Sequence, residues 1–253
     1  MARGRPMPNL PTHIALARRA AERLQYPLIH NNPSAFLLGA TAPDIRIITK
    51  RPREEYHFAE LDFEHVGAGM GGLFEAHPTL RKPRDKATRA FVAGYLTHLM
   101  ADEVWITTMF RPYFANDELF PDRDQGLVMD RACQLQLDRE NRPDVAPLVG
   151  VLRRPMKRIG VGFIPPETLV AWQAWTADFL NERAYNWERL RNQARRIARG
   201  DDPHPAHDHT DAFIAGLPDS MARLHERVPE GCLVDYQTNA VDILTGTLKD
   251  YLG

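Results

Sequence analysis

The segment AFVAGYLTHLMADEVW, residues 90–105, decides the expected fold and places two titratable side chains where a helix should bury hydrocarbon. Its apolar residues recur every three or four positions, as neighbours on one helical face do, and His98 and Asp102 stand on the same stripe. Since a buried carboxylate is costly unless a charge or hydrogen bonds meet it, the fold must supply a partner. A metal ion suits an imidazole and a carboxylate one turn apart. Gly94, one turn before His98, is expected to let another element approach closely.

The rest of the chain predicts an all-α fold, because helical patterns alternate with proline and glycine and no strand alternation occurs. Residues 50–83 are interpreted as a long irregular segment with room for one short helix, and residues 201–211 as a polar loop. A helix starting at Asn9 or Thr12 should end near Leu24. Further helices are expected at about 33–42, 85–109, 124–140, 166–199, 211–228 and 233–252.

Composition favours one all-α domain over residues 1–253, because a single core can grow to about 250–300 residues. The formal charge of -1 gives no global attraction to nucleic acid or an anionic membrane. The two distant cysteines, Cys133 and Cys232, are expected to be reduced thiols. The N-terminus lacks the apolar core of a secretory signal, and no apolar run approaches the roughly 20 residues of a membrane span. We therefore expect a cytoplasmic protein; the sequence leaves its oligomeric state open, a homo-oligomer included.

Three upstream residues stand where further ligands would be expected. His13 lies in line with the apolar positions of the first helix, so it can face the core. Asp44 follows Pro43 at a fixed bend, and His57 lies between two aromatic residues. The alternative for His98 and Asp102 is a buried pair satisfied by backbone or arginine, and His13 alone could be a cap or a core histidine.

Together, His13, the Pro-Asp pair at 43–44, His57 and the HxxxD motif at 98–102 resemble the zinc-dependent phospholipase C family, which is related to the single-strand-specific zinc nucleases. The segments THIALA near the start, FLLGATAPDI at 36–45 and AFVAGYLTHLMAD at 90–102 look like that family's motifs. The resemblance covers roughly the first 110 residues. It implies an all-α fold, a metal cluster between helices and hydrolysis of phosphate esters.

Carried over residue by residue, the resemblance implies that one metal position has four ligands: Asp44, His57, His98 and Asp102. Asp102 would bridge to a second position that includes His13. The implied cofactor is Zn²⁺, as one or two ions, and Asp44 is the candidate catalytic residue that holds or deprotonates the attacking water.

The sequence also departs from the family pattern. No tryptophan precedes His13, whereas secreted members begin with a metal-binding tryptophan. Thr108 stands near the place of a further family histidine. The helix around 129–140 offers Asp130, Gln134 and Asp138 instead of the family's histidine and carboxylate. A second metal position is therefore incomplete, and an oxygen-rich site would favour a harder ion than zinc.

Other polar and aromatic features are interpreted as structural. His204, His207 and His209 are assigned to the solvated loop at 201–211, and Trp172, Trp175 and Trp187 to the core. The arginines of 189–199 are interpreted as a solvated helix face, with contact to phosphate or lipid headgroups as the alternative.

The expected function is metal-dependent hydrolysis of a phosphate ester, a small molecule or a phospholipid headgroup, in the manner of a phosphodiesterase. Two alternatives stay open: a metal-dependent lyase or cyclase acting on a small metabolite, and a non-catalytic protein in which the metal only holds helices together.

Overall fold

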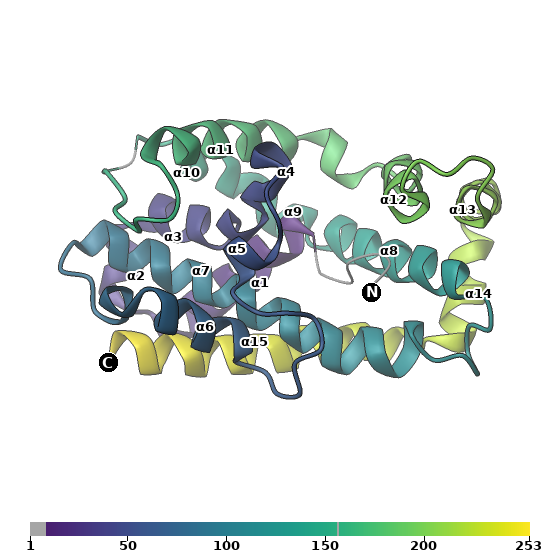
Figure 1. The fold of residues 1–253 in the computed structure, drawn as a ribbon, viewed down its shortest axis with the longest axis horizontal. Coiled ribbons are helices and arrows are strands. Elements are labelled where there is room, and N and C mark those ends of the chain that lie inside the picture. The colour runs from purple at the N-terminus through teal and green to yellow at the C-terminus, as the bar shows by residue number, and fades with distance from the viewer. Residues whose placement is uncertain (1–8, 156) are drawn as a thin grey trace.

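The computed structural model describes residues 9–155 and 157–253, and these contain helices and no strands (Figure 1). The all-α prediction is therefore confirmed over the described residues. The expectation about the N-terminus concerns residues 1–24, of which 1–8 lie outside the described residues. The principal helices are α1 (Leu10–Leu24), α3 (Pro33–Gly39), α7 (Lys86–Trp105), α8 (Arg123–Glu140), α11 (Pro166–Phe179), α12 (Arg189–Ala198), α13 (Pro205–Ala215), α14 (Asp219–Arg227) and α15 (Glu230–Leu252). Shorter elements are α2 (Pro27–Asn31), η1 (Ala42–Ile45), α4 (Arg46–Thr49), α5 (Glu54–His57), α6 (Ala68–Ala76), η2 (Pro78–Arg81), η3 (Ile106–Phe114), α9 (Arg142–Val145), η4 (Ala146–Leu148), α10 (Val149–Leu152) and η5 (Glu182–Tyr185).

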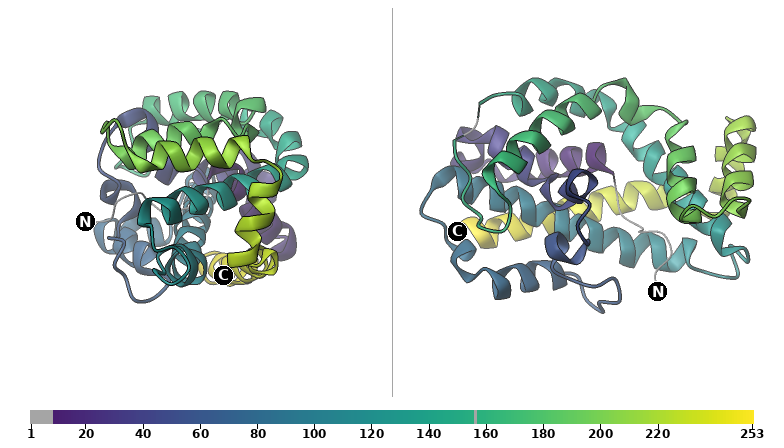
Figure 2. Two further views of the ribbon diagram at one scale, coloured as in Figure 1. Left: turned by 90° about the vertical axis from the view of Figure 1, so that its right-hand side faces the viewer. Right: turned by 45° about the horizontal axis from the view of Figure 1, so that its top comes forward.

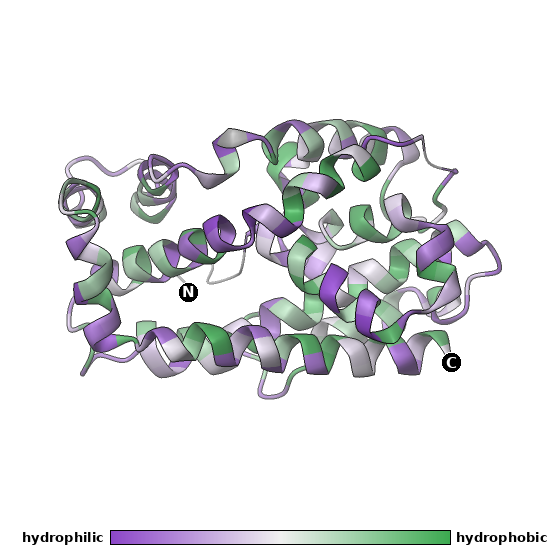
Figure 3. Ribbon diagram, turned by 180° about the vertical axis from the view of Figure 1, so that it is seen from behind, coloured by the Kyte–Doolittle hydropathy of each residue, from purple (hydrophilic) through white to green (hydrophobic). Residues whose placement is uncertain are grey.

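Helix α7 is the central element, and nearly all of its side chains are buried. Asp85 begins it by accepting a hydrogen bond from the Thr88 amide at 2.7 Å. Helices α1, α3 and α15 pack against it, and α15 extends along one side of the molecule (Figure 1). From behind, α15 alternates hydrophobic and hydrophilic patches along its length, as expected of a helix with one face in the core (Figure 3).

Helices α3 and α7 approach each other closely, and their contact depends on two glycines. A Cβ on Gly94 would lie 1.9 Å from the Phe36 carbonyl oxygen, and one on Gly39 would lie 2.0 Å from the Phe91 carbonyl oxygen. Only glycine permits this separation. The close approach predicted at Gly94 is confirmed, and it brings the end of α3 against the turn of α7 that carries His98.

The segment expected to be irregular, 50–83, contains more helix than predicted. The glycine-rich stretch GAGMGG lies mostly in α6. The Glu103 carboxylate on α7 accepts hydrogen bonds from the amides of Gly67, Ala68 and Gly69, so it satisfies the first turn of α6. A Cβ on Gly72 would lie 2.1 Å from the Phe58 carbonyl oxygen. Gly69 and Gly72 therefore serve close packing rather than a loop.

Three further boundaries were predicted wrongly. The helix expected over 166–199 is two helices, α11 and α12, because Asn186 forms a turn in which its side chain accepts from the Glu188 amide at 2.9 Å. The loop expected over 201–211 already belongs to α13 from Pro205, with His204 as the N-cap. The helix expected over 211–228 is interrupted at Gly216 and Pro218 between α13 and α14.

The predicted helix at 85–109 continues past Trp105 as the π-helix η3. The helices expected at 124–140 and 233–252 are confirmed as α8 and α15, the latter beginning three residues earlier. Cys133 and Cys232 are both free thiols. None of the helices in the described residues is long and apolar enough to cross a membrane. Helices α8 and α12–α14 gather at one end of the molecule (Figure 2).

Candidate metal centre

The five residues proposed as metal ligands come from four elements and meet beside α7. His13 lies on α1, Asp44 in η1 and His57 at the end of α5, while His98 and Asp102 are one turn apart on α7. Their ligand atoms form two overlapping groups, each within 4.8 Å: His13, His98 and Asp102 in one, and Asp44, His57 and His98 in the other. The structure thus brings together residues up to 89 positions apart in the chain.

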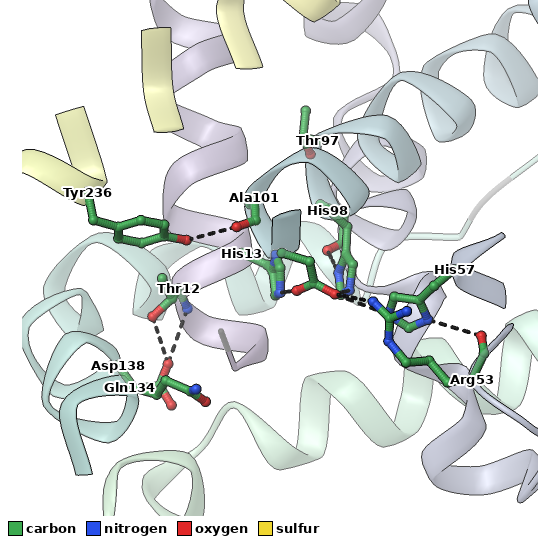
Figure 4. Close-up of polar contacts among 12 residues, drawn as sticks. Thr12, His13, Arg53, His57, Thr97, His98, Ala101, Gln134, Asp138 and Tyr236 are labelled. Atoms are coloured by element: carbon green, nitrogen blue, oxygen red, sulfur yellow. Dashed lines mark hydrogen bonds and ion pairs between the residues drawn. The ribbon is translucent and has the colours of Figure 1, made fainter. Parts of the chain in front are cut away.

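Asp102 is the centre of the arrangement and is fully buried. The side chains of His13, His98, His57 and Arg53 lie close together in the same place (Figure 4). Its Oδ1 atom lies 3.1 Å from Nε2 of His13. Its Oδ2 atom lies 3.3 Å from Nε2 of His57 and 3.7 Å from Nε2 of His98. Three imidazoles from three helices therefore direct the same nitrogen toward one carboxylate.

Backbone carbonyls fix the orientation of two of these rings. Nδ1 of His98 lies 2.9 Å from the Ala40 carbonyl oxygen, and Nδ1 of His57 lies 3.3 Å from the Arg53 carbonyl oxygen. An Nδ1–H that donates to these carbonyls leaves Nε2 with a free lone pair facing Asp102. Metal-binding histidines are commonly oriented in this way. The close approach of α3 at Gly94 thus supplies the carbonyl that aims His98.

Burial makes these nitrogens unusually hard to protonate. It lowers the pKa of His57 to about 4, with a further contribution from the Arg53 charge. Burial and the neighbouring His13 lower the pKa of His98 to about 3. Burial alone would raise the pKa of Asp102, but the surrounding side chains of His98, His13 and His57 hold it well below its usual range. The site thus combines the neutral imidazoles of His57 and His98 with an ionised carboxylate.

The donor set fits a divalent metal ion. Among the described residues, Nε2 of His13, His57 and His98 and Oδ1 of Asp102 are buried without a well-directed hydrogen bond. Buried polar atoms of this kind normally have a partner. Imidazole nitrogens and carboxylate oxygens are ligands that zinc accepts. Asp44, the fifth residue, is only half-buried and so stands nearer to solvent.

An arginine that the sequence analysis did not single out also reaches Asp102. The side chain of Arg53 is 3% exposed, and its Nη2 lies 3.3 Å from Oδ2 of Asp102. The sequence left open that an arginine satisfies the buried carboxylate. The structure contains that ion pair as well as the three histidine contacts. The sequence did contain one signal that points to Arg53. It precedes His57 by four residues, one helical turn, so the two side chains can lie on the same face of a helix.

The polar residues of α8 are buried, but within the described part of the chain they belong to neither group of ligand atoms. Asp130 accepts from Nε1 of Trp105 at 2.9 Å and from Nε2 of Gln134 at 2.8 Å. Asp138 accepts from the Thr12 hydroxyl at 2.9 Å, one residue before His13, and from Arg189 at 3.0 Å. They act here as hydrogen-bonding partners in the core.

The histidines assigned to the loop at 201–211 lie instead at the start of α13, away from the centre. His204 caps the helix by accepting from the Ala206 amide at 3.2 Å, and His209 lies 2.6 Å from Asp122. Thr108, in the place of a family histidine, donates to the Val104 carbonyl at 2.7 Å. Trp172 is fully buried, as predicted for a core residue.

This geometry defines a helical protein with a buried histidine and carboxylate centre. Residues 12–105 match the model of the family described as zinc-dependent phospholipase C. The resemblance inferred from the sequence is confirmed over that segment, which contains all five candidate ligands. No curated protein and no solved structure matches the chain.

Proposed function

We propose that this protein is a metal-dependent hydrolase of phosphate esters, with the metal held by His13, Asp44, His57, His98 and Asp102. The observation that carries the proposal is the buried Nε2 atoms of three histidines around one ionised carboxylate, within the segment that matches the zinc-dependent phospholipase C family. A divalent ion in such a centre activates water at neutral pH and neutralises charge on phosphoryl oxygens.

The chain's own residues divide the remaining work. His57 and His98 stay neutral at physiological pH, so their lone pairs are available without loss of a proton. Asp102 contributes the negative charge at the floor of the site. Asp44 is the one candidate ligand that is partly open to solvent, which suits the proposed role of orienting the attacking water and accepting its proton.

The proposal is tested by measuring the metal content of freshly purified protein, followed by hydrolysis assays. The substrates are an aryl phosphate monoester, a bis-aryl phosphate, a choline phosphate ester and single-stranded DNA. We expect bound divalent metal and metal-dependent release of product from at least one phosphate ester, with both lost in His98→Ala. Protein that binds no metal would overturn the proposal. Bound metal without phosphoesterase activity would favour the lyase, cyclase or purely structural alternatives.

A further inference from the structure

Two short basic segments lie at the end of the molecule opposite α12 and α13 (Figure 1, left). Residues 81–86 read RKPRDK, with four basic side chains and one acidic, and lead from η2 into α7. Residues 153–158 read RRPMKR, with four basic side chains and none acidic, and follow α10. Because the whole chain has a formal charge of -1, these segments concentrate positive charge at one place.

The fold joins the start of α7 to the stretch that follows the second segment. The Gly160 amide donates to the Thr88 hydroxyl at 3.1 Å. On either side of this glycine, Ile159 and Val161 are each 4% exposed and belong to the same hydrophobic cluster as Leu80. Both stretches are therefore anchored in the core, so the space between them exists before any ligand binds.

That space is a cleft of about 510 Å³. The volume lies within the roughly 300–1,000 Å³ of small-molecule sites. Three cationic side chains line it, those of Lys82, Arg84 and Arg158, and Asp85 is the one acidic residue among the described residues of its lining. Clefts lined mainly by one sign of charge concentrate ligands of the opposite sign.

The three cationic side chains of the cleft are not committed elsewhere. All three are exposed, and within the described part of the chain none of them makes an ion pair or a side-chain hydrogen bond. Their neighbours differ, since the Arg81 guanidinium lies 4.8 Å from the centroid of the Phe74 ring and Arg153 pairs with Asp178 at 2.7 Å. The cleft thus collects the cations that have no internal partner.

The other polar groups of the lining belong to the start of α7. Asp85 is the N-cap, because its Oδ1 accepts from the Thr88 amide at 2.7 Å. Thr88 is 4% exposed, and its hydroxyl accepts from Gly160 but donates no hydrogen bond to any described residue. Buried hydroxyls normally use their donor. This one lines the cleft, where an acceptor atom of a ligand would satisfy it.

The cleft is separate from the candidate metal centre. Helix α7 begins at Lys86, and His98 follows twelve residues later, which is about 18 Å along the helix axis. None of the described residues that line the cleft is a candidate metal ligand. A ligand bound here is therefore distinct from a substrate at the metal.

We propose that Lys82, Arg84 and Arg158, together with the Thr88 hydroxyl, form a second binding site, for the phosphate group of a small molecule or a lipid headgroup. A phosphate monoester presents three acceptor oxygens and up to two negative charges. Guanidinium groups match such oxygens in a bidentate way, and the lysine adds a point charge. The inference does not depend on the proposed function, because the site contains no metal ligand.

The test uses a pair of substitutions that differ in charge alone. A Cβ on Gly160 would meet nothing within 4 Å, so the fold accepts a side chain there. Gly160→Asp adds a carboxylate to the cleft, and Gly160→Asn adds a neutral group of the same size. Titration calorimetry with inorganic phosphate at low ionic strength measures binding, on as-purified and on chelator-treated protein. Thermal unfolding of each variant checks the fold.

We expect phosphate binding that survives removal of metal, since phosphate held by a metal ion would be lost with it. Gly160→Asp should weaken this binding by at least about tenfold, and Gly160→Asn by less than about threefold. Lys82→Gln and Arg158→Gln should each weaken it by about tenfold, since each removes a charged donor. Arg195→Gln is the control, because this exposed arginine lies on α12 and is hydrogen-bonded to Asn192.

A second arm identifies the source of the phosphate group. The protein is sedimented with phosphatidylcholine vesicles, with and without phosphatidic acid. Sedimentation that requires phosphatidic acid and is lost in Gly160→Asp would support the site and assign it to a lipid headgroup. Phosphate binding without sedimentation would support the site and assign it to a soluble ligand. Equal binding by Gly160→Asp and Gly160→Asn, or no binding in either arm, would overturn the proposal.

Discussion

The imidazole rings of His13 and His98 stack face to face, with centroids 3.7 Å apart and planes inclined by 11°. The two rings come from different helices, α1 and α7, yet both present Nε2 to Asp102. Protonating both rings would place two cations in contact inside the core. The stack therefore holds a pair of imidazoles of which His98 stays neutral. His98 is also the one side chain that the two groups of ligand atoms share.

His98 belongs to both groups, so its loss should be more damaging than the loss of His13. We expect His98→Ala to weaken Zn²⁺ binding by more than about 100-fold, since even partners behind a ligand contribute 10- to 100-fold. His13→Ala should retain one ion if wild-type protein binds two. Equilibrium dialysis with metal analysis measures both, with exposed His30→Ala as the control. Equal metal retention in His98→Ala and wild type would contradict the assignment.

The buried histidines should make the metal-free protein sensitive to acid. In the unfolded chain His57 and His98 take up protons near their usual pKa of about 6.5, whereas in the fold they do so only near 4 and 3. The unfolded state therefore binds more protons in this window, and stability falls as the pH drops from about 6.5 toward 4. Thermal unfolding between pH 4 and 8 measures this, and His57→Asn should flatten the curve. An unchanged slope in that variant would contradict the lowered pKa.

The sequence predicted the parts of this site that are local. His98 and Asp102 are one turn apart on a helix whose apolar period is clear, and Gly94 marked a close contact on the same helix. The ion pair between Arg53 and Asp102 was not found this way, because it joins residues 49 positions apart that no single helical period links.

The wrongly predicted helix boundaries share a physical cause. Proline and glycine, which usually interrupt helices, also occur within or at the start of a helix. Pro205 is typical of a loop in composition, although proline also fits the first turn of a helix. The glycines of 67–72 suggest an irregular segment, although Gly72 allows α6 to approach the backbone of Phe58. At α6 the deciding interaction is made by a distant residue, because Glu103 on α7 accepts from the amides of its first turn. At α13 it is made by the neighbouring His204, which caps the helix.

Gly94→Ala should destabilise the protein by about 3 kcal/mol, because its Cβ would overlap the Phe36 carbonyl and overpacking costs on this order. It should also weaken Zn²⁺ binding, since α3 carries the Ala40 carbonyl that orients His98. Gly246→Ala is the matched control. That glycine is exposed in α15 with open space around it, so alanine should stabilise the helix by up to about 1 kcal/mol. Chemical denaturation measures both, and a neutral Gly94→Ala would contradict the close packing.

Glu103 should matter for the position of His57 although it does not contact that ring. Its carboxylate holds three amides at the start of α6, and Gly69 in that turn packs against the His57 carbonyl. Glu103→Gln should cost about 1–3 kcal/mol of stability, because an NH₂ group that cannot accept a hydrogen bond replaces one of the two accepting oxygens. Zn²⁺ affinity should fall with it. Exposed Glu55→Gln should change stability by less than about 1 kcal/mol. Calorimetric unfolding and metal titration compare the two variants. Equal stability and equal Zn²⁺ affinity in Glu103→Gln and Glu55→Gln would argue against a role of Glu103 in positioning His57.

Asp44 gives the sharpest separation between holding the metal and using it. It shares a group with His57 and His98 but is only half-buried, so replacing it leaves the buried part of the centre in place. In Asp44→Asn we expect retained fold and at least one bound ion, with turnover of the best phosphate ester reduced by about 10²- to 10⁴-fold, the usual contribution of a general base. Metal analysis and steady-state kinetics on the same preparation measure both. Full turnover with full metal content would remove Asp44 from catalysis, whereas complete loss of metal would make it a ligand whose catalytic role this variant does not reveal.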